Sequence, residues 1–189
     1  MDDIELLAGV LAKTGDLIAG VGDDQWALPT PCPDYDVRTL VNHMVAWVQV
    51  FDAGCHGRPA PEDRATYQAA DPAGEFRAAA ASLVAGWQKY GLDRPVRVTG
   101  GESPGPMVFN MTVMEYLTHG WDLATATSQP VPYTEGEAAA MLARAETTLP
   151  AQYRGAGMPF GDIVPTPDDA PAIDRAVAFL GRRPVPLRS

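Results

Sequence analysis

Apolar side chains recur at helical spacing in several separate stretches of the chain. In residues 3–20, Ile4, Leu7, Val10, Leu11, Leu17 and Ile18 lie close to helical spacing, until Gly20 and Gly22 end the run. The same spacing predicts five further helices, at residues 37–54, 72–90, 112–127, 134–149 and 168–181. Six helical patterns, with at most one pair of short strands, indicate a mainly helical, bundle-like domain.

Polar residues and glycine mark several of these helix ends. Asp36 is a good N-cap for the second helix, and Thr134 with Glu137 has the spacing of a capping box. Gly91 closes the third helix. Residues 27–36 contain three prolines and predict an irregular loop. Residues 95–112 predict two short extended pieces around a Gly/Pro turn, a possible small β-hairpin.

Length and charge restrict the classes of function. The 189 residues fit one domain over 1–189, with enough chain to bury a core. Lys and Arg total 14 against 24 Asp and Glu, a formal charge of −10. This excess repels phosphate backbones and anionic lipid, so nucleic-acid and membrane-surface partners are not expected. No apolar run is long enough to span a bilayer and the first residues lack a basic segment, which predicts a cytoplasmic protein.

The chain has three histidines, and two of them lie on helical faces with polar neighbours. His43 lies at the boundary of the apolar face of its helix, one turn before Trp47, so it either packs half-buried against Trp47 or faces a site. Glu115 and His119 are spaced i,i+4, and Asp122 falls on the same side. This stripe is either one half of a site or a solvated helix face.

The combination favours a metal site. His43 with Glu115 and His119 offers two imidazoles and one carboxylate from two neighbouring helices. Three protein ligands leave coordination positions open, as in catalytic metal sites, and zinc, Fe(II) or another first-row divalent ion fits this set. His56 follows the second helix, where we expect it to be exposed near the helix C-terminus and not a ligand.

The two cysteines are not expected to form a disulfide. Cys32 and Cys55 flank a predicted helix of about 18 residues, which is about 27 Å long. A disulfide requires Cα atoms within about 7 Å. We therefore expect two thiols, with Cys32 fixed in its Pro-Cys-Pro loop rather than acting in redox chemistry.

Two stretches resemble a known family. TPCPDYDVRTLVNHM and MEYLTHGWDLATAT are similar to the motifs of the DinB-like superfamily, in the branch related to the N-terminal domain of mycothiol-dependent maleylpyruvate isomerase. The resemblance extends from about Leu6 to Arg182. It implies an all-α, DinB-like four-helix bundle with a long crossover, extra short helices, and a divalent metal held by His43, Glu115 and His119. The isomerase has a second, C-terminal domain, which we do not expect in this chain.

The resemblance also implies a reaction. The metal, zinc first with nickel or iron as alternatives, would hold a low-molecular-weight thiol such as mycothiol or bacillithiol as its thiolate. The thiolate would attack a small electrophile and give a conjugate or an isomer, with Asp122 either beside a ligand or as a general base.

Two other functions stay open at this stage. The chain is alternatively a non-catalytic helical binding or stress-response module, or a metal-dependent hydrolase in which water replaces the thiol. Whether it is an enzyme is left open. Its expected partners are a small-molecule substrate and a thiol, and a homodimer is one alternative for the oligomeric state.

Overall fold

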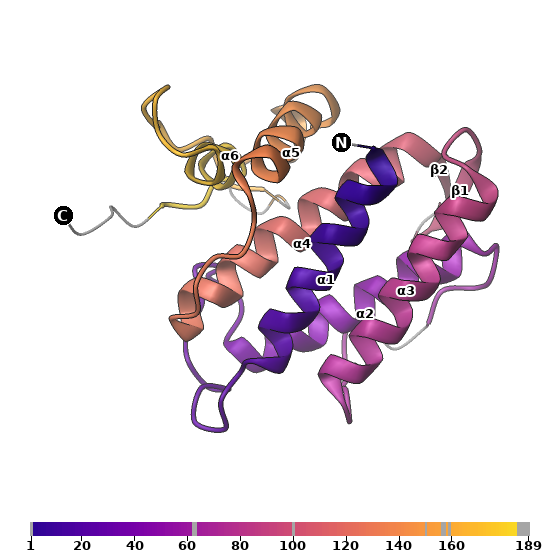
Figure 1. The fold of residues 1–189 in the computed structure, drawn as a ribbon, viewed down its shortest axis with the longest axis horizontal. Helices are drawn as coiled ribbons and strands as arrows, with labels where there is room; N and C mark the ends of the chain where they lie inside the picture. The colour runs from indigo at the N-terminus through magenta and orange to yellow at the C-terminus, as the bar shows by residue number, and fades with distance from the viewer. Residues whose placement is uncertain are drawn as a thin grey trace. The chain divides into compact units, whose positions relative to one another are not determined.

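The structure, a computed structural model, describes residues 2–61, 64–99, 101–149, 151–155, 158 and 160–184. The chain divides into two compact units, Met1–Val131 and Pro132–Ser189. Within the described residues, the first unit holds four long helices and a hairpin, and the second holds two shorter α-helices (Figure 1). The mainly helical fold with one small hairpin is therefore confirmed, while a single domain over 1–189 stays a prediction.

The first unit is a four-helix bundle. Its elements are α1 (Asp3–Ala19), α2 (Val37–Cys55), α3 (Pro72–Tyr90), β1 (Pro95–Val98), β2 (Gly101–Pro104) and α4 (Gly105–Thr127). Both α1 and α2 pack against α3 and α4, so α1 and α2 lie diagonally across the bundle. The apolar faces meet in a core that includes Leu7, Val41, Leu83 and Leu117, all with no exposed surface. Burial of these faces stabilises the bundle.

Short-range hydrogen bonds fix the helix starts that the sequence predicts. The Asp36 side chain accepts a bond of 2.8 Å from the backbone N–H of Thr39, as expected of the N-cap of α2. Asp71 caps α3 in the same way. Gly91 ends α3 with φ of +72°, a conformation that glycine adopts without strain.

Helix α4 begins seven residues earlier than the predicted start at Thr112. The hairpin lies where the sequence predicts it, with Pro95 opposite Pro104, but the chain turns helical at Gly105. Proline is tolerated in the first turn of a helix because the N–H it lacks has no partner there. Val108 and Phe109, which continue the apolar spacing, are buried in the core and extend the helix. The glycine is required, because a side chain at 105 would collide with the Leu92 carbonyl.

The connection from α2 to α3 returns along α2. Its described part is held by the Asn42 side chain, which donates to the Gln68 amide oxygen at 3.0 Å and accepts from the backbone N–H of Ala69 at 2.9 Å. The Gln49 amide donates to the Tyr67 hydroxyl at 2.9 Å. This long connection places the start of α3 beside the first half of α2.

The second unit is built on α5 (Glu135–Thr148) and α6 (Ala172–Phe179), which pack together, with a 3₁₀ turn, η1, at Ala151–Tyr153. The capping box predicted for α5 is present. Helix α6 is shorter than the predicted 168–181, because Pro171 precedes its first turn and Gly181, with φ of +87°, follows it. Nowhere in the described chain does a helix combine the length and apolar character needed to cross a membrane.

Candidate metal site

Three side chains from two helices converge inside the first unit. His43 comes from α2, and Glu115 and His119 come from α4, which packs against α2. One ligand atom from each lies within 4.8 Å of the others. The His43 Nε2 is 2.8 Å from Glu115 Oε1, and the His119 Nε2 is 3.6 Å from the same oxygen. The structure thus brings together the three donors that the sequence singles out.

The polar stripe of α4 is not a solvated helix face. His119 is 8% exposed and Asp122 has no exposed surface. The interpretation of this stripe as helix surface is therefore wrong, because α1 and α2 both pack against α4 and enclose most of its length. Periodicity alone cannot recognise a helix that is buried on several sides, since its polar residues then lie inside.

His43 and His119 each have a partner at Nδ1, and the Nε2 of each ring faces Glu115. The Asp122 carboxylate lies 3.0 Å from the Nδ1 of His119, and the Tyr35 hydroxyl lies 3.2 Å from the Nδ1 of His43. A partner at one ring nitrogen fixes the orientation of the ring and leaves the other nitrogen for a second role. His43 also lies near Trp47, with ring centroids 6.2 Å apart, so its packing against Trp47 is seen as well.

The proline-rich loop before α2 supplies two residues to this region. Its own hydrogen bonds stiffen it: the Thr30 hydroxyl reaches the carbonyls of Cys32 and Tyr35 at 3.0 and 2.8 Å, and the N–H of Tyr35 donates to the Cys32 carbonyl at 3.1 Å. Cys32, His119 and Asp122 form a second group whose ligand atoms all lie within 4.8 Å. No pattern in the sequence places Cys32 or Tyr35 there, because both positions depend on how the loop folds onto α4.

The Tyr35 phenol stays protonated at neutral pH. Burial raises its pKa, and the nearby acidic groups of Cys32, Glu115 and Asp34 raise it further. The neutral hydroxyl can accept a hydrogen bond from a protonated His43 Nδ1 and still has a proton to donate.

The third histidine lies at the other end of α2. His56 is half-buried rather than exposed as predicted, because its Nδ1 lies 3.0 Å from the Asp52 carbonyl and 3.1 Å from Asp52 Oδ1, and its ring packs edge-on against Tyr90. Cys55 is fully buried, and burial raises the pKa of its thiol. Both cysteines of the chain are thiols, as predicted.

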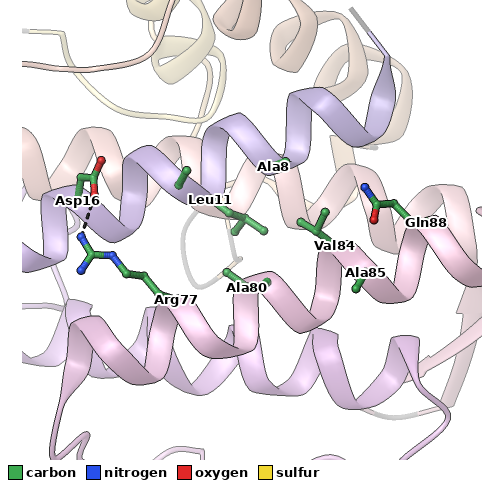
Figure 2. A pocket seen from close by; sticks show the side chains of 10 residues that line it. Ala8, Leu11, Asp16, Arg77, Ala80, Val84, Ala85 and Gln88 are labelled. Atoms are coloured by element: carbon green, nitrogen blue, oxygen red, sulfur yellow. Dashed lines mark hydrogen bonds and ion pairs between the residues drawn. The ribbon is translucent and has the colours of Figure 1, made fainter.

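An open groove of about 430 Å³ lies between α1 and α3 (Figure 2). Its walls are mostly small apolar side chains, such as Ala8 and Ala80, and the Asp16–Arg77 ion pair lies at one end with a separation of 2.8 Å. It contains neither His43 nor His119 and offers no nucleophile, so the candidate chemistry lies elsewhere.

The comparisons with known proteins decide the family. Residues 7–124 match the mycothiol maleylpyruvate isomerase N-terminal domain. The chain belongs to this family. Two uncharacterised proteins of Mycobacterium tuberculosis, from strains CDC 1551 and H37Rv, are each 34% identical to the chain over 170 residues, which cover 88% of this chain and 90% of each relative. No solved structure matches the chain.

Mycothiol maleylpyruvate isomerase N-terminal domains are generally metal-binding. The match includes all three converging donors, because His43, Glu115 and His119 lie within residues 7–124. Two imidazoles and one carboxylate suit a first-row divalent ion. The donor set therefore fits the metal that the family implies.

Proposed function

We propose that the protein holds a divalent metal ion at His43, Glu115 and His119 and uses it, with a low-molecular-weight thiol, to convert a small electrophile. Zinc is the first choice of metal, with nickel or iron as alternatives, and mycothiol is the thiol that the family suggests. The reaction class is S-transfer or isomerisation. One observation carries the proposal: three donors converge from two helices, and among the described residues no fourth His, Cys, Asp or Glu joins their group.

The orientation of both imidazoles supports this ligand set. With an ion bound, the Nδ1–H of His119 would donate to Asp122 and that of His43 to Tyr35, which would leave both Nε2 lone pairs, on the side of Glu115, for the ion. Metal-binding histidines commonly have such a partner at the other ring nitrogen. The 2.8 Å contact between His43 and Glu115 is the separation at which two donors can share a proton or an ion.

The exposure of the ligands leaves room for a small molecule. The side chains of His43 and Glu115 are 21% and 23% exposed, whereas that of His119 is 10% exposed. The open coordination positions would therefore face the side of His43 and Glu115. A substrate thiol could enter from that side.

A bound divalent ion supplies one chemical step, since it lowers the pKa of a coordinated thiol and presents the thiolate at neutral pH. The chain's own residues position the reactants. Asp122 is fully buried and bonded to His119, so it orients that ring and is poorly placed to take a proton from a substrate. The Tyr35 hydroxyl, 3.2 Å from His43 Nδ1, has a proton that it could donate to a bound molecule.

Metal content tests the ligand set. Protein purified without a histidine tag is expected to contain near-stoichiometric divalent metal by elemental analysis, either as isolated or after reconstitution. His43→Ala and His119→Ala should each lose it and keep the helical circular dichroism of the wild type, because the core is built from other residues. His56→Ala is the matched control and should keep the metal. Full metal content in either site variant, or none in the reconstituted wild type, contradicts the proposal.

Turnover tests the reaction class. A panel of small electrophiles is incubated with the metal-loaded protein, with and without mycothiol, and products are followed by mass spectrometry. A product that requires the thiol and is absent with His119→Ala supports the proposal. A product formed with water alone would identify a hydrolase, and a metal-loaded protein without any product would favour a binding module.

A further inference from the structure

A second group of donors lies beside the first and shares one residue with it. We propose that Cys32, His119 and Asp122 form a second metal site, which takes a thiophilic divalent cation such as Cd²⁺ in place of the ion at His43, Glu115 and His119. The statement that an ion at one site excludes an ion at the other rests on the proposed function above. The second site itself rests only on the geometry of its own three residues.

The donors come together from two elements that are fixed before any ion binds. His119 and Asp122 lie on α4, almost or entirely without exposed surface, and Cys32 comes from the loop at residues 27–36. Their ligand atoms lie within 4.8 Å of one another, and Asp122 Oδ2 is 3.0 Å from His119 Nδ1. Backbone and Thr30 hydrogen bonds hold the loop, so the sulfur is placed by the fold rather than gathered by the metal.

The donor types separate the two sites. The first set offers two nitrogens and one oxygen, while the second offers one sulfur, one nitrogen and one oxygen. Thiolate ligands favour soft cations. Binding of Cd²⁺ breaks the S–H bond of Cys32, the proton passes to solvent and the sulfur lone pair forms the bond to the metal. A thiophilic cation can therefore bind a thiolate at the second site, and the first site offers no thiolate.

His119 makes the two sites alternatives. A neutral imidazole has one N–H and one lone pair. When the lone pair is on Nε2, it faces Glu115 and the N–H at Nδ1 donates to Asp122. When the lone pair is on Nδ1, it lies beside Asp122 and the proton lies on Nε2. One neutral ring can therefore serve one ion at a time.

Cadmium binding tests the second site without any measurement of activity. Full-length, reduced, metal-free protein is titrated with Cd²⁺ and the near-ultraviolet absorption of thiolate-to-cadmium charge transfer is followed. The wild type is expected to show this band and to saturate at a single equivalent. Cys32→Ser should lose the band, and Cys55→Ala, the matched control with the other cysteine changed, should keep it. A band that persists in Cys32→Ser, or two tightly bound equivalents in the wild type, overturns the proposal.

One more variant separates this proposal from the proposed function. His43→Ala removes a donor of the first site alone, so it should keep the cadmium band even where it no longer binds zinc. Loss of the band in His43→Ala would show that the sulfur-bound ion also requires His43, so that Cys32, His119 and Asp122 do not form a site of their own. Because Cys32→Ser could disturb the loop, the cadmium NMR shift of the wild type gives a separate measurement. A shift typical of nitrogen and oxygen ligands without sulfur also overturns the proposal.

Discussion

The two ends of α2 carry the same kinds of side chain but differ in how these are arranged. Near the start of the helix, His43 meets a carboxylate from α4, and a cysteine lies close by on the preceding loop. At its end, Asp52, Cys55 and His56 all come from α2 or its last turn. Among the described residues, the groups able to hold a metal lie only at the first end.

The charged partners explain the difference. Arg58 forms an ion pair with Asp52, and Arg94 donates to the Cys55 carbonyl and lies 3.5 Å from its sulfur. A guanidinium stays charged at every ordinary pH, so a metal ion would have to compete with a cation that is already paired with these groups. At the first end, Glu115 pairs with two imidazoles, which can exchange a proton for a metal ion. The type of cation beside a carboxylate thus separates a structural cluster from a candidate site.

Removing one carboxylate at each end of α2 is expected to give the largest effects, one on zinc affinity and the other on stability. Glu115→Ala should weaken zinc binding by more than about 100-fold, beyond the 10–100-fold typical for residues behind a ligand, with little change in the stability of the metal-free protein. Asp52→Ala should keep zinc affinity but lower the free energy of unfolding by about 1–3 kcal/mol. The Asp52 carboxylate is mostly buried, and the groups that pair with it would be left without that partner. Calorimetric zinc titration and urea denaturation measure the two quantities. Equal loss of zinc affinity in both variants would remove the distinction between the ends.

A smaller effect on zinc binding is expected from a residue that contacts a proposed ligand and not the ion. Tyr35→Phe removes only the hydroxyl that holds the Nδ1 of His43, and should weaken zinc binding by about 10–100-fold, or about 1.4–2.7 kcal/mol. Competition with a chromogenic chelator measures it. Tyr67→Phe is the control, because the Tyr67 hydroxyl bonds to Gln49 and Glu75 and not to a donor of either candidate site. Unchanged zinc affinity in Tyr35→Phe would show that the hydroxyl does not position the ring.

The smallest effect concerns the cap of α2 at its first end. Hydrogen bonds from the Thr39 side chain and backbone lower the pKa of Asp36 below its ordinary 3.8. The folded-state pKa is thus below the unfolded one, so the stabilisation is complete above the unfolded pKa and disappears as the pH falls through the folded pKa. Asp36→Ala should therefore cost about 1 kcal/mol near neutral pH and a smaller amount well below pH 3.8, where the carboxyl group is neutral. Urea denaturation at the two pH values tests this, and a cost of the same size in acid would show that the charge of Asp36 does not strengthen the cap.

Local patterns predict much of the fold. The spacing of apolar residues and the capping residues Asp36 and Thr134 depend on neighbours within one or two turns, which the sequence displays directly. The start of α4 is missed, because a Gly/Pro segment that usually breaks structure here forms its first turn against the Leu92 carbonyl.

The site is predicted in part for the same reason. Glu115 and His119 are one helical turn apart, so their proximity is local, and a motif resemblance adds His43. Cys32 and Tyr35 reach the same region only through the path of a proline-rich loop, and the burial of Asp122 depends on how α1 and α2 pack against α4. Such long-range packing has no signature in the spacing of residues along one chain.

The separation of the donors along the chain has a consequence during synthesis. His43 and Glu115 are 72 residues apart, so a growing chain exposes His43 long before it contains its partners. The donor set is complete only after α4 has left the ribosome and packed against α2. Metal loading at the proposed site would therefore follow closure of the bundle, and a chain truncated before α4 would have a histidine but no place for an ion.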